Sequence, residues 1–176
     1  YKRQEWGVWA VPSNTVNNEI DEKPWQIAPA ISEQIYTLED ALLFAEMQMV
    51  IIRNADAIKI ACQSLLTNIS ACIMTEKGGG HWLQTIYYPF YYFANYAKGI
   101  VLNVSSTGPV YDCKEFNNVP YVDSIVVWND EDGELVFFAV NRDEDNKQKV
   151  SLQLSDFEVD SVIESIGMTA ADKKMT

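Results

Sequence analysis

Positive charge is scarce in this 176-residue sequence, which has 13 lysine and arginine residues against 25 aspartate and glutamate residues. The formal net charge of −12 disfavours binding to nucleic acid or to anionic membrane surfaces, because both need clustered basic side chains. Histidine occurs once, at His81, which excludes a catalytic pair of histidines and disfavours a histidine-based metal site. A neutral or cationic partner fits this composition better, and we expect neither a metal nor a cofactor.

Long apolar runs are also lacking, since the sequence contains no uncharged apolar stretch of about 18 residues, the length that a membrane-spanning helix needs. The run from Met49 to Ile52, for example, stops at Arg53. Cysteine is sparse, and Cys62, Cys72 and Cys113 are odd in number and widely spaced, unlike the framework of a secreted disulfide protein. We therefore expect no membrane span and a cytoplasmic location. Cys62 and Cys72 are interpreted as buried, inert thiols among apolar neighbours.

Other groups that could hold a ligand lack the required spacing. The acidic clusters at 130–132 and 143–145 do not follow the ligand order of a calcium loop, so we interpret them as solvated turns. The triple glycine at 78–80 is not followed by Gly-Lys-Ser/Thr, which excludes a phosphate loop. His81 comes directly after it and is interpreted as a solvated loop residue.

The first half of the sequence has the pattern of a βαβ unit. A short apolar run at 6–11, ended by a proline, predicts a buried strand. Thr37 and Asp40 resemble a capping box, and the strong helix formers after them predict a helix over Leu38–Arg53. Its apolar residues cover most of its circumference, so we expect it to pack on several sides, with its methionines filling the core. A strand predicted at 57–62 then implies a parallel strand pair.

The second half changes character. A helix is expected at Leu83–Lys98, closed by Gly99 as its C-terminal cap. After it, apolar strands at 122–129 and 135–140 flank an Asp-Gly turn, which predicts a hairpin. Further strands are expected at 149–154 and 161–165. Short strands joined by acidic turns, without helices, indicate an antiparallel β-sandwich.

The domain boundary is therefore placed near residue 105, giving an α/β part at 1–105 and an all-β part at 106–176. The first residues contain neither an initiator methionine nor an apolar signal core. We expect the chain to be the later part of a longer protein.

Glu5 is the most unusual polar residue in this arrangement. It directly precedes Trp6 in an apolar strand, where an unpaired carboxylate costs several kcal/mol. A carboxylate at this position therefore needs a structural or a catalytic role. The residues alone do not decide between the two.

An ordered series of segments resembles the α-L-arabinofuranosidases of glycoside hydrolase family 51. The segments are Glu5-Trp6-Gly7-Val8-Trp9, Lys23-Pro24-Trp25-Gln26-Ile27-Ala28-Pro29, Ile35-Tyr36-Thr37-Leu38-Glu39-Asp40-Ala41-Leu42, Ala55-Asp56-Ala57-Ile58-Lys59-Ile60-Ala61, Ile73-Met74-Thr75-Glu76, Gln84-Thr85-Ile86-Tyr87-Tyr88-Pro89-Phe90 and Val119-Pro120-Tyr121-Val122-Asp123-Ser124. They cover most of the chain.

The resemblance implies that residues 1–105 are the end of a (β/α)₈ TIM barrel, from strand 7 to helix 8, and that residues 106–176 form an antiparallel β-sandwich or jelly roll. It implies a retaining hydrolase, of the non-reducing-end arabinofuranosidase class, that releases terminal α-L-arabinofuranosyl residues from arabinoxylan, arabinan or arabino-oligosaccharides. Glu5 would be the catalytic nucleophile. The acid/base glutamate of the family lies on strand 4, outside this sequence, so the chain alone is expected to be inactive.

The resemblance also implies that Trp9 and Trp6 bind substrate, although core packing of Trp9 beside Trp6 is an equal alternative. The implied partners are the arabinofuranosyl substrate and the missing N-terminal barrel portion, and a homo-oligomer is compatible with the family. Three departures affect the site: Gln4 replaces a common aspartate, Gly7 a usual asparagine, and Leu65 a sugar-contacting glutamine, with Gln63 two residues earlier. These departures keep open a noncatalytic remnant or a carbohydrate-binding or assembly module.

Overall fold

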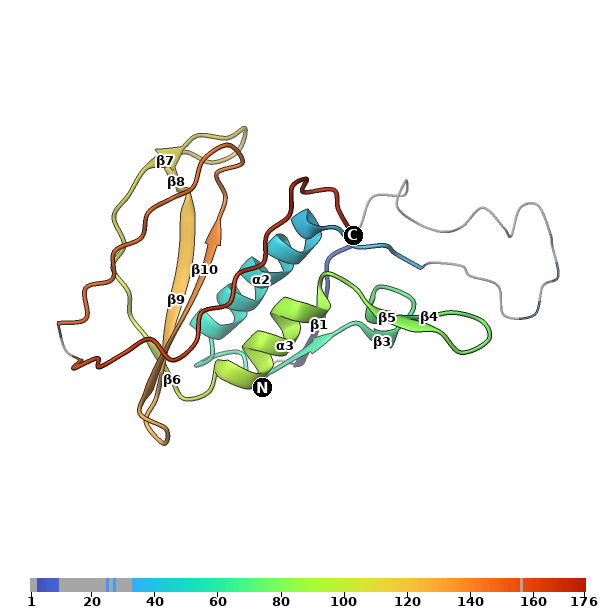
Figure 1. Cartoon of the computed structure of the whole chain (residues 1–176), viewed down its shortest axis with the longest axis horizontal. Coiled ribbons are helices and arrows are strands. Elements are labelled where there is room, and N and C mark those ends of the chain that lie inside the picture. Colours follow the sequence, from blue (N-terminus) through green and yellow to red (C-terminus); the bar gives the residue numbers. More distant parts are fainter. Residues whose placement is uncertain (1–2, 10–24, 26, 28–32, 156) are drawn as a thin grey trace.

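The computed structural model describes residues 3–9, 25, 27, 33–155 and 157–176 (Figure 1). The helices are α2 (Leu38–Arg53) and α3 (Tyr87–Tyr96). The strands are β1 (Arg3–Trp6), β2 (Ile60–Gln63), β3 (Leu65–Thr67), β4 (Ala71–Thr75), β5 (His81–Leu83), β6 (Ile100–Leu102), β7 (Val110–Tyr111), β8 (Val119–Pro120), β9 (Val122–Asn129) and β10 (Glu134–Asn141). No helix in these described ranges is both long and apolar enough to cross a bilayer.

Helix α2 begins where its capping signal predicts. The Thr37 hydroxyl accepts a hydrogen bond from the Asp40 N–H at 3.4 Å, and the Asp40 carboxylate accepts one from the Thr37 N–H at 2.8 Å. This reciprocal pair satisfies two backbone donors at the helix start. The predicted capping box and helix are therefore confirmed.

Strands β1 and β2 form a parallel pair in the register Arg3↔Ile60 to Trp6↔Gln63, so the predicted βαβ arrangement is confirmed. The strand bounds differ from the prediction. β1 ends at Trp6, and Val8 and Trp9 follow it as irregular backbone, whereas β2 begins at Ile60. Residues 10 and 11 of the predicted first strand lie outside the described residues.

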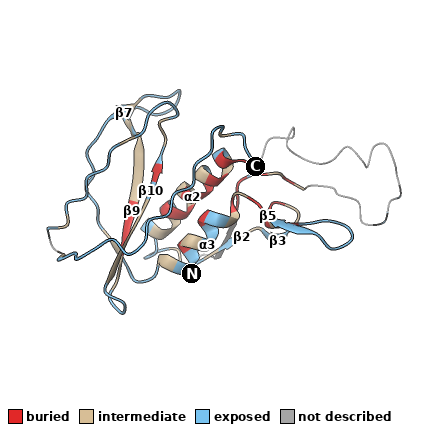
Figure 2. Cartoon of the chain, viewed as in Figure 1, coloured by how far each residue is buried: buried red, intermediate tan, exposed pale blue. Residues whose placement is uncertain are grey.

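Helix α2 contributes to two hydrophobic core clusters, as its apolar circumference predicts (Figure 2). Phe44 belongs to the cluster on the side of β1, whose buried members are Trp6, Val8, Tyr36, Ala41, Phe44, Cys72 and Ile86. Met49 belongs to the cluster on the side of the C-terminal sheet, whose buried members are Ala45, Met49, Phe93, Ile125, Val127 and Val140. Both Phe44 and Met49 are fully buried. The predicted core-filling role of Met49 is confirmed, and Met47 packs against the first cluster.

The C-terminal sheet has the antiparallel order β10-β9-β6, and the predicted hairpin between β9 and β10 is confirmed. Smaller sheets are β3-β4-β5 and the ribbon β7-β8. β6 lies before residue 105 and nevertheless pairs with β9, while the division at 105 itself stays a prediction.

The strands expected at 149–154 and 161–165 are wrong, because the described residues form no strand there. Val162 and Ile163 are 80% and 79% exposed. An alternating or β-branched pattern makes a strand only where a sheet edge and a packing surface are available to it. Both stretches instead run as irregular chain, the earlier one beside the C-terminal sheet, and the red chain that follows passes over the helices (Figure 1).

Gly99 has a different role from the predicted helix cap. α3 ends at the C-cap Ala97, so the predicted helix at 83–98 is too long at its start and by two residues at its end. Gly99 has a φ of +112°, and a Cβ at this position would lie 2.2 Å from the backbone oxygen of Trp128. A glycine is required because the backbone before β6 passes directly against β9.

A network of charged side chains joins α2 to the C-terminal sheet. Asp123 of β9 forms ion pairs with Arg53 and Arg142, and Arg142 also pairs with Glu46 of α2. Arg53 donates a further hydrogen bond of 3.0 Å to the Ser124 carbonyl. These side chains are only partly exposed, so the pairs are less screened than those on an open surface.

Gly99→Ala is expected to lower the free energy of unfolding by roughly 3 kcal/mol, because it combines a strained φ with overpacking against Trp128. Urea unfolding followed by circular dichroism measures this. Gly167→Ala is the matched control, since nothing lies within 4 Å of the added Cβ. Equal unfolding midpoints for the two variants would contradict the proposed close approach.

Gln48→Met is expected to raise the free energy of unfolding by about 1 kcal/mol. Gln48 on α2 is 8% exposed, and its Oε1 has no hydrogen-bond partner among the described residues. Methionine keeps a similar volume and removes the unsatisfied acceptor. Gln84→Met is the contrasting variant and should destabilise, because both ends of the Gln84 amide are hydrogen-bonded. Destabilisation by Gln48→Met in the same unfolding assay would refute this account.

Candidate active site

The candidate active site lies at the carboxyl ends of β1 and β2. Because the two strands are parallel, these ends meet at the same edge of the sheet. Glu5 is the penultimate residue of β1 and is in register with Cys62, and Trp6 is in register with Gln63. The side chains of Glu5 and Gln4 lie outside the described residues, so the nucleophile role of Glu5 stays a prediction.

The two tryptophans predicted to bind substrate have different environments. Trp6 is 9% exposed and its ring centroid lies 4.5 Å from that of Phe44, within the core cluster. Trp9 is 59% exposed. A Cβ on Gly7 would lie 3.6 Å from the Trp9 ring, which shows that this ring folds back over the end of β1. The ring of Trp6 is packed in the core, whereas the ring of Trp9 is accessible to solvent. Sugar binding by either ring stays a prediction.

Tyr36 holds the segment between these tryptophans. Its hydroxyl donates a hydrogen bond of 2.6 Å to the Val8 carbonyl, and its N–H donates one of 3.0 Å to the Gln84 side chain. Gln84 in turn donates to the Ala71 carbonyl at 2.7 Å. Burial raises the pKa of Tyr36 to about 12, so the phenol stays protonated and remains a donor at neutral pH. The sequence reasoning did not single out Tyr36, although it directly precedes the capping box.

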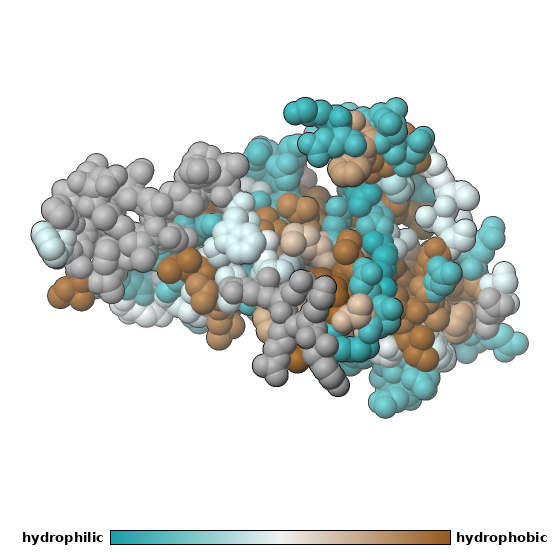
Figure 3. Space-filling view, turned by 180° about the vertical axis from the view of Figure 1, so that it is seen from behind, coloured by the Kyte–Doolittle hydropathy of each residue, from teal (hydrophilic) through white to brown (hydrophobic). Residues whose placement is uncertain are grey.

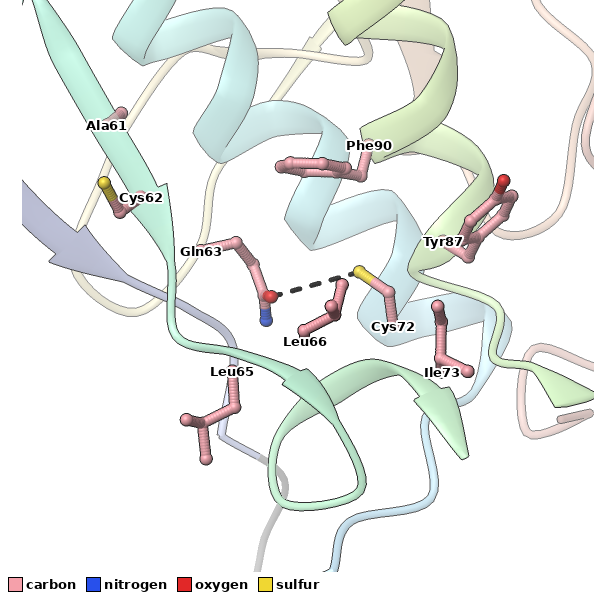
Figure 4. A pocket seen from close by; sticks show the side chains of 9 residues that line it. All are labelled: Ala61, Cys62, Gln63, Leu65, Leu66, Cys72, Ile73, Tyr87 and Phe90. Carbon is pink, nitrogen blue, oxygen red and sulfur yellow. Dashed lines mark hydrogen bonds between the residues drawn. The ribbon is translucent and has the colours of Figure 1, made fainter. Parts of the chain in front are cut away.

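The side chain of Gln63 is engaged within the chain. Its amide donates a 2.8 Å hydrogen bond to the Ser70 carbonyl, and its oxygen accepts a weak contact of 4.0 Å from the Cys72 thiol. Figure 4 shows this amide directed toward Cys72, with Leu65 directed away from it. Leu65, at the position where the resemblance implies an amide, is apolar and 46% exposed.

The prediction of a buried Cys62 is wrong, because this thiol is exposed. Ala61 packs against the core cluster, and successive residues of a strand point to opposite faces, so Cys62 points away from α2. Cys72 is buried as predicted, and burial raises the pKa of its thiol to about 11, which makes it a poor nucleophile. An open apolar pocket of about 330 Å³ near Cys72 extends between β2 and α3 (Figure 4).

His81 is exposed, as expected, but it lies in β5 rather than in a loop. The segments described in the structure contain no group of three or more His, Cys, Asp or Glu side chains able to hold a metal ion.

Comparison with protein families matches residues 4–176 to the family described as the α-L-arabinofuranosidase C-terminal domain. Among curated proteins, an intracellular exo-α-(1→5)-L-arabinofuranosidase of Halalkalibacterium halodurans is 41% identical over 172 residues, covering 98% of this chain and 34% of that protein. Intracellular exo-α-(1→5)-L-arabinofuranosidase 1 of Bacillus subtilis is likewise 41% identical, over 98% of this chain and 34% of its own length. The chain thus spans about a third of these relatives.

Comparison with solved structures points to the same family. A family 51 α-L-arabinofuranosidase from Bifidobacterium longum superposes with a TM-score of 0.68 and 30% identity, covering 80% of this chain and 27% of that chain. The family 51 enzyme from Xanthomonas axonopodis pv. citri, at 23% identity, shares the fold with a TM-score of 0.62 over 79% of this chain and 26% of that chain. The sheet-rich C-terminal half fits the β-sandwich domain of such proteins. The chain belongs to the α-L-arabinofuranosidase C-terminal domain family of glycoside hydrolase family 51 proteins.

Proposed function

We propose that this chain is the C-terminal portion of a retaining, exo-acting α-L-arabinofuranosidase that works inside the cell. Its substrates would be arabinoxylan, arabinan or their oligosaccharides, from which it releases terminal α-L-arabinofuranosyl residues. The observation that carries the proposal is the parallel β1-β2 pair, joined through α2, with Glu5 at the carboxyl end of β1. It is combined with 41% identity to a protein named for this activity.

The α/β part is proposed to be the end of a (β/α)₈ barrel, with β1 and β2 as its strands 7 and 8 and with α2 and α3 as the helices that follow them. Such barrels build their active sites at the carboxyl ends of the strands. Glu5 is the penultimate residue of β1, which supports the catalytic role proposed for it.

The proposed reaction is a double displacement. The Glu5 carboxylate attacks the anomeric carbon of the arabinofuranosyl unit while a carboxylic acid protonates the departing glycosidic oxygen, which leaves a glycosyl ester on Glu5. Water, deprotonated by the second carboxylate, then attacks the same carbon and releases arabinose with retained configuration and a free Glu5. In retaining enzymes the two carboxyl groups lie about 5 Å apart. The second group would come from an upstream strand, so the chain alone is proposed to be inactive.

The distribution of exposed apolar surface supports completion by an upstream barrel portion (Figure 3). On α2, Leu43 and Val50 are 49% and 50% exposed and line an apolar pocket of about 420 Å³ together with Met47. On β2, Ile60 is 43% exposed, and among the described residues this strand pairs only with β1. Burying such surface against further barrel elements would be favourable.

One observation favours a second candidate, a noncatalytic carbohydrate-binding or assembly module. Because the Gln63 amide is bonded to the Ser70 carbonyl and Leu65 is apolar, neither position offers the sugar a free amide. The two candidates make different predictions for Glu5.

Glu5→Ala, in the full-length protein that carries this chain, is expected to lower the hydrolysis of an aryl α-L-arabinofuranoside by about 10,000-fold or more, because the nucleophile is lost. Added azide should partly restore release of the aryl group and yield a glycosyl azide of inverted configuration. Glu115→Ala, at an exposed glutamate before β8, serves as the control and should keep full activity. Unchanged hydrolysis by the Glu5 variant, or no hydrolysis by the unmodified protein, would favour the noncatalytic candidate.

Trp9→Ala is expected to raise KM for the same substrate roughly tenfold, because an accessible aromatic face for the sugar is removed. Its free energy of unfolding should change by about 0.5 kcal/mol or less, since Trp9 is 59% exposed. Trp6→Ala should instead cost about 3 to 5 kcal/mol of stability, because Trp6 fills the core beside Phe44. Steady-state kinetics and urea unfolding on both variants measure the contrast. A Trp9 variant with unaltered KM would remove Trp9 from the proposed site.

A further inference from the structure

The last residues of the chain return to the first turn of α2. The N–H groups of Leu38 and Glu39 donate to the carbonyls of Met175 and Lys173 at 2.9 and 3.1 Å. The first amides of an α-helix have no partner within the helix. The capping box of Thr37 satisfies the amide of Asp40 but not those of Leu38 and Glu39. The carbonyls of Met175 and Lys173 supply the acceptors for these two amides.

The C-terminal segment has a defined local shape. Within it, the N–H groups of Lys174 and Met175 bond to the side chain and carbonyl of Asp172 at 2.9 and 3.1 Å. This turn presents the two carbonyls toward the helix start. We refer to residues 172–175 as the C-terminal cap.

Ion pairs accompany the backbone contacts of the C-terminal cap. The Lys174 ammonium is 3.2 Å from the Glu39 carboxylate, and the Lys173 ammonium is 2.7 Å from that of Glu144, which follows β10. These groups are substantially exposed, so each pair contributes little free energy. They lie on the same side as the backbone hydrogen bonds, which are the stronger constraint on the position of the C-terminal cap.

Further contacts guide the chain to this position. The Phe157 ring lies 5.1 Å from that of Trp128 on β9. The hydrogen bond that the Tyr96 phenol donates to Glu164 raises the pKa of Tyr96 and ties the segment to α3. Figure 1 shows the red C-terminal segment passing over the helices and ending beside the start of α2.

The start of α2 is directly connected to the candidate active site. The Thr37 carbonyl accepts a 2.8 Å hydrogen bond from the Thr85 hydroxyl, and the preceding residue, Tyr36, holds the Val8 carbonyl at 2.6 Å. Val8 adjoins the accessible Trp9. Residues 36–39 therefore bond both to the C-terminal cap and to the segment that follows β1.

We propose that the C-terminal cap is a positioning segment for the active site. By supplying acceptors to the first turn of α2, it fixes the Tyr36-Thr37 backbone, and through the Tyr36 hydroxyl it holds the Val8-Trp9 segment in the geometry that sugar binding requires. The part that concerns sugar binding rests on the proposed function. The part that concerns the helix start does not.

The test is deletion of residues 172–176 in the full-length protein that carries this chain. Amide hydrogen exchange at Leu38 and Glu39 is expected to be about tenfold faster or more, since both amides lose their acceptors. KM for an aryl α-L-arabinofuranoside should rise several-fold, on the order of fivefold, with kcat nearly unchanged, because positioning of the binding segment is altered and the reacting groups remain.

Two further variants separate the steps. Tyr36→Phe removes only the hydroxyl and should reproduce the rise in KM while leaving exchange at Leu38 and Glu39 unchanged. Lys147→Ala/Lys149→Ala removes two positive charges from lysines that form no ion pair within the described part of the chain, and should change neither quantity.

Unchanged exchange at Leu38 and Glu39 in the deletion variant would overturn the capping role. Faster exchange with an unaltered KM would overturn the positioning role and leave the segment merely structural. If the unmodified protein shows no hydrolysis, the proposed function fails, and the exchange measurement alone still decides whether the C-terminal cap acts on α2.

Discussion

Helix α2 has apolar residues on two sides and must bury both, and the arrangement of the other elements follows from this requirement. Phe44 packs toward β1 and β2, whereas Met49 packs toward β9 and β10. A helix with one apolar face could lie on either unit alone, but this one needs both. Asp123 also pairs with two arginines at once, and removing Asp123 or Arg142 would leave Arg53 or Glu46, respectively, without its ion-pair partner. The α/β part and the C-terminal sheet are therefore held together by shared packing and by charge.

The same helix also organises the candidate site, through its first turn rather than its sides. Tyr36, directly before the helix cap, is fully desolvated and donates its only phenolic proton to the Val8 carbonyl. Breaking this buried bond would take the donor away from the Val8 carbonyl, which is unfavourable. The backbone after β1 is thereby fixed by a residue far away in the sequence, which is how a site at strand ends can be held in place without being built from regular structure.

Local signals in the sequence predicted the elements that depend on local chemistry. The capping box at Thr37 located the start of α2, and the Asp-Gly turn located the β9-β10 hairpin. Features that depend on the surroundings could not be predicted in this way. The apolar neighbours of Cys62 in the sequence predicted a buried thiol. Whether the thiol is buried depends instead on which elements pack on that face of β2, and it is exposed. The bond from Tyr36 to Val8 crosses 28 residues and has no pattern in the sequence. The resemblance named Glu5, Trp6 and Trp9, and it could not distinguish the packed ring of Trp6 from the accessible ring of Trp9.

The close approach of Gly99 to Trp128 limits the exchange of the C-terminal sheet between proteins as a separate module. Only Lys98 and Gly99 separate the cap of α3 from β6, and the glycine is wedged against the neighbouring strand. A joint this short and this crowded cannot act as a linker. Recombination that cut here would have to reproduce both the helix end and the strand that it touches, so the sheet and α3 are expected to be inherited and exchanged as a single unit.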